Sequence, residues 1–138
     1  MNSLEFTIIK NLVTNDEYRR QVYPYLKKEY FESDHNSLLF TLVSEFISTY
    51  EKCPTKESLE VDLQNKKNIS EESYKNVSTL IQQLEPDNCD YKWLLDSTEE
   101  WCRNRAIYLS LVESIQIADG NDKEKDMGAI PSILSDAI

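Results

Sequence analysis

The chain has 138 residues and a net charge of −10, with 40% hydrophobic residues and only two glycines. A chain of this length can fold without disulfide or metal cross-links, and so few glycines disfavour a sheet protein built on tight turns. Acidic residues outnumber lysines and arginines by 25 to 15. This balance excludes tight binding of a nucleic-acid backbone by this chain alone, because such binding requires clustered basic residues.

The sequence contains no targeting or membrane-spanning pattern. Its N-terminal residues lack the basic start and long apolar run of a signal peptide, and no stretch approaches the roughly 18 apolar residues that cross a membrane. The three cysteines, at positions 53, 89 and 102, are irregularly spaced, which is typical of reduced thiols. We therefore expect a cytoplasmic, all-α protein that does not contact a membrane.

The first third of the chain predicts three helices. Apolar residues at helical spacing in 4–13 predict the first, and Asn15 and Asp16 offer a cap for the second, which Pro24 disturbs. Asp34 is expected to cap a longer third helix. The apolar positions of that helix are Leu38, Leu39, Leu42, Val43, Phe46, Ile47 and Tyr50.

Two shorter helices follow. Pro54 ends the third helix, and Thr55 with Ser58 begins the next one. Ser70 begins another helix, which Pro86 ends. The buried face of this last helix is expected to consist of Tyr74, Val77, Leu80, Ile81 and Leu84. Together these elements predict a globular helical head over residues 1–88.

Residues 89–138 predict an antiparallel helical hairpin that projects from the head. Asp90 can cap a helix that continues to about Ala118, which would be roughly 42 Å long at 1.5 Å per residue. Gly120 is typical of a helix end, and Pro131 suits the first turn of a closing helix. The closing helix would carry its apolar face on Ile130, Ile133, Leu134, Ala137 and Ile138.

The long helix of the hairpin is more apolar than one partner helix requires. Its heptad-like seam consists of Leu94, Thr98, Trp101, Arg105, Tyr108, Val112 and Ile115. Nine of the thirteen residues between positions 106 and 118 are apolar, so they cover well over half of the helix circumference. Either the head of the same chain or another chain must cover this surface.

No residue cluster typical of catalysis occurs in the sequence. His35 is the only histidine, the cysteines do not have zinc-site spacing, and the two glycines cannot form a phosphate-binding loop. Cys102 lies near Arg103 and Arg105, which could lower its pKa, but the favoured interpretation is an inert, half-buried thiol. We therefore expect no catalytic, cofactor-binding or metal-binding residues and no enzymatic activity in this chain.

A family resemblance emerges when several segments are taken in order. These segments are Glu29 to His35, Leu38 to Phe40, Pro54-Thr55, Arg105-Ala106 and Ile130 to Ala137. Together they resemble the N-terminal domain of DnaB-type replicative DNA helicases. Segments that recur in the primase-helicase component of T-even-like bacteriophages are Val22 to Leu26, Glu29 to Ser33, Tyr91 to Leu95, Asn104 to Ala106 and Gly128 to Pro131. The resemblance covers almost the whole chain.

The resemblance also indicates what lies outside these residues. The family continues into a RecA-like motor domain that holds the ATP, magnesium and DNA sites. The helical pattern stops at Ile138 without a cap, which is more typical of a cut at a linker helix than of a natural C-terminus, although both are compatible with it. ATP and magnesium are therefore expected only for the missing motor.

The resemblance implies a non-catalytic role in assembly and docking. In such helicases the hairpins pair between subunits, and six N-terminal domains form a collar on which primase docks. A helicase loader is another partner that the resemblance allows, in the host-cell cytoplasm. The residues expected in the oligomer interface are Tyr108, Leu111, Val112, Ile115, Ile130, Ile133, Leu134 and Ile138.

Two other classes of function are alternatives to this one. An independent acidic phage protein that mimics DNA and occupies a DNA-binding enzyme would fit the net charge. A mimic needs an ordered array of carboxylates, however, whereas the acidic residues here lie mostly on ordinary helix surfaces. A small hydrolase or thiol enzyme would need a nucleophile with a positioned base, which the sequence lacks.

Overall fold

The computed structural model describes residues 3–122 and 124–138, which form helices and no strand. The α-helices in these residues are α1 (Ser3–Thr14), α2 (Asp16–Val22), α3 (Asp34–Tyr50), α4 (Lys56–Gln64), α5 (Glu71–Gln82), α6 (Tyr91–Ala118) and α7 (Ile130–Ala137). Short 3-10 turns occur at η1 (Tyr23–Tyr25), η2 (Lys28–Tyr30) and η3 (Met127–Ala129). The all-α prediction is therefore confirmed.

The contacts divide the chain into two compact units, Met1–Leu95 and Asp96–Ile138. The boundary lies inside α6, which is continuous in the structure. The predicted division of the chain at residue 88 stays a prediction.

Side-chain caps explain where the helices of the first unit begin. Asn15 accepts a hydrogen bond from the Tyr18 amide at 3.0 Å, and Thr55 and Ser58 form a reciprocal capping box. For α3 the predicted cap was wrong by one residue. Ser33 has the extended backbone of an N-cap, whereas Asp34 lies in the first turn, where its charge favours the positive end of the helix dipole.

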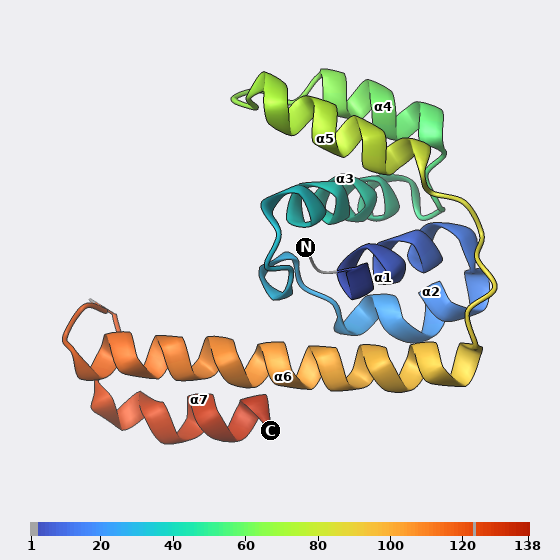
Figure 1. Cartoon of the computed structure of the whole chain (residues 1–138). Coiled ribbons are helices and arrows are strands. Elements are labelled where there is room, and N and C mark those ends of the chain that lie inside the picture. The colour runs from blue at the N-terminus through green and yellow to red at the C-terminus, as the bar shows by residue number, and fades with distance from the viewer. Residues whose placement is uncertain (1–2, 123) are drawn as a thin grey trace. The chain divides into compact units, whose positions relative to one another are not determined.

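The first unit is built around α3. Figure 1 shows α3 between α1 and the α4–α5 pair, and α1 also packs against α2. The fully buried apolar residues of these helices are Ile8, Ile9, Leu12, Tyr18, Leu39, Val43, Leu59, Val77 and Ile81. They recur at helical spacing along each element, so each helix presents one apolar face to a shared core.

The segment between α5 and α6 is tied back to the head. The Lys10 ammonium lies 2.9 Å from the Asp87 carboxylate, which also accepts a hydrogen bond from Asn11 at 3.4 Å. The Tyr91 hydroxyl donates to Gln21 at 3.0 Å. These contacts hold the start of α6 against α1 and α2.

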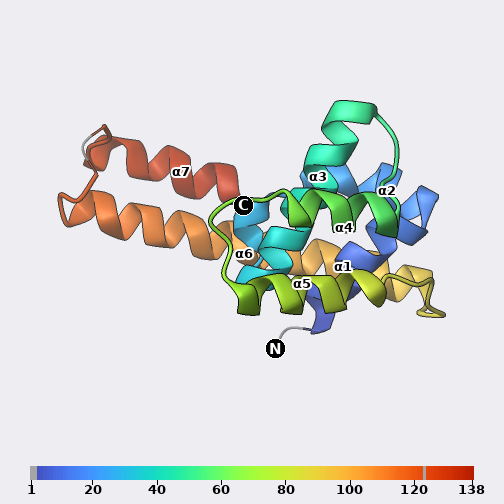
Figure 2. The same ribbon diagram turned by 90° about the horizontal axis from the view of Figure 1, so that it is seen from above.

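The second unit is a helical hairpin. Figures 1 and 2 both show α7 running back alongside the C-terminal part of α6. Gly120 supplies the left-handed backbone that ends α6, with a φ of 76°, and Lys125 pairs with Glu113 at 2.8 Å. Pro131 lies in the first turn of α7, as predicted. Within the described residues, no helix combines the length and apolarity needed to cross a membrane.

Candidate interaction surfaces

The buried face of α6 within the hairpin unit is formed partly by small residues. Ser110, Ser114 and Ile117 are each less than a tenth exposed. Their spacings of four and three place them on one side of the helix. Small serine side chains let a neighbouring backbone approach closely, which suits the packing of a short second helix.

The predicted seam of α6 is covered unevenly within one chain. Leu94, Thr98 and Trp101 are buried, whereas Tyr108 and Ile115 are more than half exposed, so their role in an oligomer interface stays a prediction. Sequence spacing finds which residues share a face, but it cannot show which face is covered when nearly the whole circumference is apolar.

Three large apolar residues form what we name the uncovered stripe: Tyr108, Leu111 and Ile115, which are 55%, 47% and 59% exposed. At 100° per residue, the stripe points roughly 125° away from the buried face at Ser110, Ser114 and Ile117. Arg105 extends it, since its guanidinium lies 4.9 Å from the centroid of the Tyr108 ring. An apolar stripe of this kind is the surface that a partner would cover.

The other predicted interface residues also keep accessible surface. Val112, Ile130, Ile133 and Leu134 are of intermediate exposure, and Ile138 is 91% exposed. None of the described residues of α7 is fully buried. Ile130, Ile133 and Leu134 of α7 are therefore only partly covered within one chain. Their place in an oligomer interface, with that of Ile138, stays a prediction.

The helicase-like signature in the head has a structural explanation. Phe31 is buried, and its ring stacks on Phe40 with centroids 4.9 Å apart. The buried Glu5 carboxylate accepts hydrogen bonds from the Glu32 amide at 2.7 Å and from the Asn36 side chain at 3.3 Å. These contacts hold the segment before α3 onto α1, so this signature positions α3.

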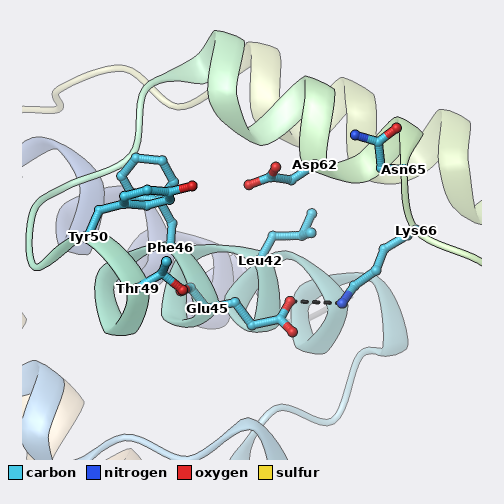
Figure 3. A pocket seen from close by; sticks show the side chains of 8 residues that line it. All are labelled: Leu42, Glu45, Phe46, Thr49, Tyr50, Asp62, Asn65 and Lys66. Carbon is cyan, nitrogen blue, oxygen red and sulfur yellow. Dashed lines mark hydrogen bonds and ion pairs between the residues drawn. The ribbon is translucent and has the colours of Figure 1, made fainter.

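A second surface, which the sequence did not reveal, lies between α3 and α4 (Figure 3). It is an open hollow of about 270 Å³, named here the α3–α4 hollow. Its lining residues are Leu42, Glu45, Phe46, Thr49, Tyr50, Asp62, Asn65 and Lys66. Phe46 and Tyr50 belong to the predicted apolar stripe of the third helix, but Tyr50 is 59% exposed. The only sequence feature that could have indicated this hollow is the aromatic pair Phe46 and Tyr50, four residues apart near the end of the third helix.

The structure gives no support to a reactive thiol at Cys102. Burial raises the pKa of Cys102 to about 11. The neighbouring arginines are engaged elsewhere, because Arg103 pairs with Glu99 at 2.8 Å and Arg105 lies over Tyr108. Among the described residues, no three histidine, cysteine, aspartate or glutamate side chains are grouped so that they could hold a metal ion.

Comparison with known proteins shows what the chain is similar to. No family model matches the chain. Over 139 aligned positions, which include 95% of the chain, it is 32% identical to the DnaB-like replicative helicase of Enterobacteria phage T4. Almost the whole chain is therefore similar in sequence to part of this helicase. The resemblance predicted from the sequence is confirmed, and the match is consistent with a DnaB-like N-terminal domain.

The aligned region spans 29% of the length of that DnaB-like relative. The chain therefore corresponds to part of that relative, and this similarity supports a helicase-associated domain.

Proposed function

We propose that this chain is the N-terminal assembly and primase-docking domain of a hexameric, ATP-dependent replicative DNA helicase in phage replication, non-catalytic on its own. It would act in the host-cell cytoplasm, and a helicase loader is a further partner of the same domain. The support comes from two directions. The chain is related over 95% of its length to part of a replicative helicase, and its hairpin carries apolar surface that one copy leaves uncovered.

The observation that carries the assembly role is the uncovered stripe. Tyr108, Leu111 and Ile115 point away from the buried face of α6, so folding of a single hairpin does not cover them. Pairing with a second hairpin would remove their apolar surface from water, which favours association by about 25 cal/mol per Å² before the entropic cost of binding.

The ATP and magnesium sites of such a helicase do not fit the residues of this chain. A phosphate-binding loop needs closely spaced glycines before a helix, whereas Gly120 and Gly128 lie eight residues apart in a loop region. The described residues also lack a cluster that could hold a metal ion. We assign both groups to a motor segment outside this chain.

Self-association provides the test of the assembly role. Light scattering over a range of concentrations is expected to give a mass that rises from one chain to two or more. The double variant Leu111→Asp, Ile115→Asp should weaken association at least thirtyfold, because two charges would be buried without partners. Circular dichroism should give the same helix content for the variant, since both positions are exposed in one chain.

A matched variant separates apolar contact from added charge. Gln116→Asp with Asn121→Asp adds the same two charges to exposed positions of the hairpin unit. This control should associate as the unchanged chain does. A strictly monomeric chain at several hundred micromolar, or equal weakening by the two double variants, would contradict the assembly role.

The docking role is tested separately with the purified primase of the same phage. Calorimetric titration of the chain with primase should give saturable binding whose affinity falls as salt is raised, because the chain carries a net charge of −10. Absence of binding to primase, with self-association intact, would remove docking from the proposal and leave assembly.

A further inference from the structure

The α3–α4 hollow has an aromatic side. The rings of Phe46 and Tyr50 lie with centroids 4.7 Å apart and planes tilted by 45°. Leu42, farther along α3, is buried, whereas Tyr50 is 59% exposed. Figure 3 shows the two rings at one end of the hollow, with the Tyr50 hydroxyl directed toward α4. An aromatic surface is therefore open to a ligand that enters from solvent.

The hollow contains one paired and one unpaired acidic side chain. Glu45 and Lys66 pair across its lower side at 2.8 Å, so each neutralises the other. Asp62 stands opposite Tyr50 on α4, and its carboxylate points into the hollow (Figure 3). Asp62 forms no hydrogen bond or ion pair with any of the described residues. The hollow thus combines open aromatic rings with one uncompensated negative charge.

This combination selects for a basic side chain. A guanidinium or ammonium group is attracted to the face of an aromatic ring and to a carboxylate, and its aliphatic stem can lie on the rings. A purely apolar group would desolvate the Asp62 carboxylate without replacing its hydrogen bonds, and an anion would be repelled. The volume of about 270 Å³ is below that of most small-molecule sites, roughly 300 to 1,000 Å³, and suits a single side chain.

We propose that the α3–α4 hollow binds an arginine or lysine side chain from a basic segment of a partner protein. The rings of Phe46 and Tyr50 hold the stem and one face of the cation, and Asp62 binds its charged end. The net charge of −10 attracts such a segment over a distance, and the hollow gives it a defined position. The inference refines the docking part of the proposed function and rests on it; self-association of the hairpin is not involved.

The test uses the whole chain and a defined probe. The chain, labelled with ¹⁵N, is titrated with a blocked peptide of alternating arginine and glycine and followed by two-dimensional amide NMR. Shift changes are expected to concentrate on residues 42–50 and 62–66. Asp62→Asn and Tyr50→Ala should each weaken binding about three- to tenfold, in line with the free energies of exposed cation–π and ion pairs.

The matched control is Glu72→Gln, which removes an exposed carboxylate of α5, away from the hollow. This variant should bind the peptide within twofold of the unchanged chain. Thermal unfolding checks that Asp62→Asn and Tyr50→Ala fold normally, as expected for exposed positions.

Three results would overturn the inference. Shift changes spread over all acidic helices, equal weakening by Asp62→Asn and Glu72→Gln, or equal binding of an alternating glutamate-glycine peptide would each show that the hollow does not select a basic side chain. Because primase is absent from the peptide titration, this experiment tests the hollow independently of the primase partner. A hollow that binds the peptide while the chain fails to bind primase would therefore count against the primase partner and leave the hollow intact.

Discussion

Glu5 shows how one buried carboxylate can organise a helical fold. Its side chain is fully buried on α1, and it accepts hydrogen bonds from the backbone amides of Glu32 and Ser33 at 2.7 and 3.3 Å. The Asn36 side chain donates a third at 3.3 Å. A buried carboxylate with several donors is a satisfied group, and it fixes the segment before α3 to α1.

Replacing Glu5 with alanine should destabilise the head by about 3 kcal/mol, because two backbone amides and the Asn36 amide would lose a charged acceptor. Urea unfolding followed by circular dichroism measures the difference. Glu72→Ala, at an exposed position, should change the free energy of unfolding by less than about 0.5 kcal/mol. Equal effects of the two substitutions would mean that the Glu5 contacts contribute nothing specific.

Cys102 should react slowly with alkylating reagents. With its pKa raised by burial to about 11, roughly 0.1% of the thiol is ionised at pH 8, and the thiolate is the reactive form. Iodoacetamide labelling at pH 8, read by peptide mass spectrometry, should be at least tenfold slower at Cys102 in the folded chain than in urea. Equal rates in the two conditions would contradict the burial of this thiol.

At the scale of elements, the helix ends and one loop contact decide the arrangement of the head. Side-chain caps at Asn15, Ser33, Thr55 and Ser70 satisfy amides that the helices leave unpaired. The loop after α5 has no helix of its own, so its position depends on Asp87, which pairs with α1.

The Asp87 contact should make stability depend on pH. Burial alone would raise the pKa of Asp87, but hydrogen bonds from Lys10 and Cys89 outweigh burial and hold the pKa below its ordinary value. The carboxylate therefore stabilises the fold above about pH 4, and this contribution is lost as the pH falls through the ordinary value toward the folded one.

The corresponding variant is Asp87→Asn, which should lower the free energy of unfolding by about 1 kcal/mol at pH 7. The difference in free energy of unfolding between the variant and the unchanged chain should become smaller as the pH falls below about 4. In this range Asp87 of the unchanged chain becomes protonated and loses its negative charge. Urea unfolding at a series of pH values measures both quantities. A difference that stays constant from pH 7 to pH 3 would show that the effect of the substitution is not electrostatic.

At the scale of the whole molecule, the net charge of −10 determines which charged molecules the chain attracts and which it repels. We expect no saturable binding of fluorescently labelled single- or double-stranded DNA below about 100 μM at 150 mM salt, because the backbone phosphates are repelled. Fluorescence anisotropy measures this. Tight binding would place a DNA site on this chain and contradict the expectation, drawn from its net charge, that this chain alone does not bind DNA tightly.

Much of the fold was predictable because it depends on local chemistry. Helical spacing, the capping residues and the prolines placed the helices, and the end of α6 near Ala118 followed from Gly120. The error at Ser33 arose because two adjacent residues can both cap a helix, and only the backbone conformation distinguishes them. The helicase resemblance likewise depends on the order of short segments, which sequence carries by itself.

Only the tertiary structure decided which apolar surface stays open. The sequence does not distinguish Tyr108, Leu111 and Ile115 from buried apolar residues of the same helix. Their exposure depends on the path of α7 and of the loop before it. The α3–α4 hollow has the same origin, because Tyr50 and Asp62 lie on different helices whose packing brings them opposite each other. Sequence periodicity records that a helix has an apolar face, whereas long-range packing determines whether this chain or a partner covers it.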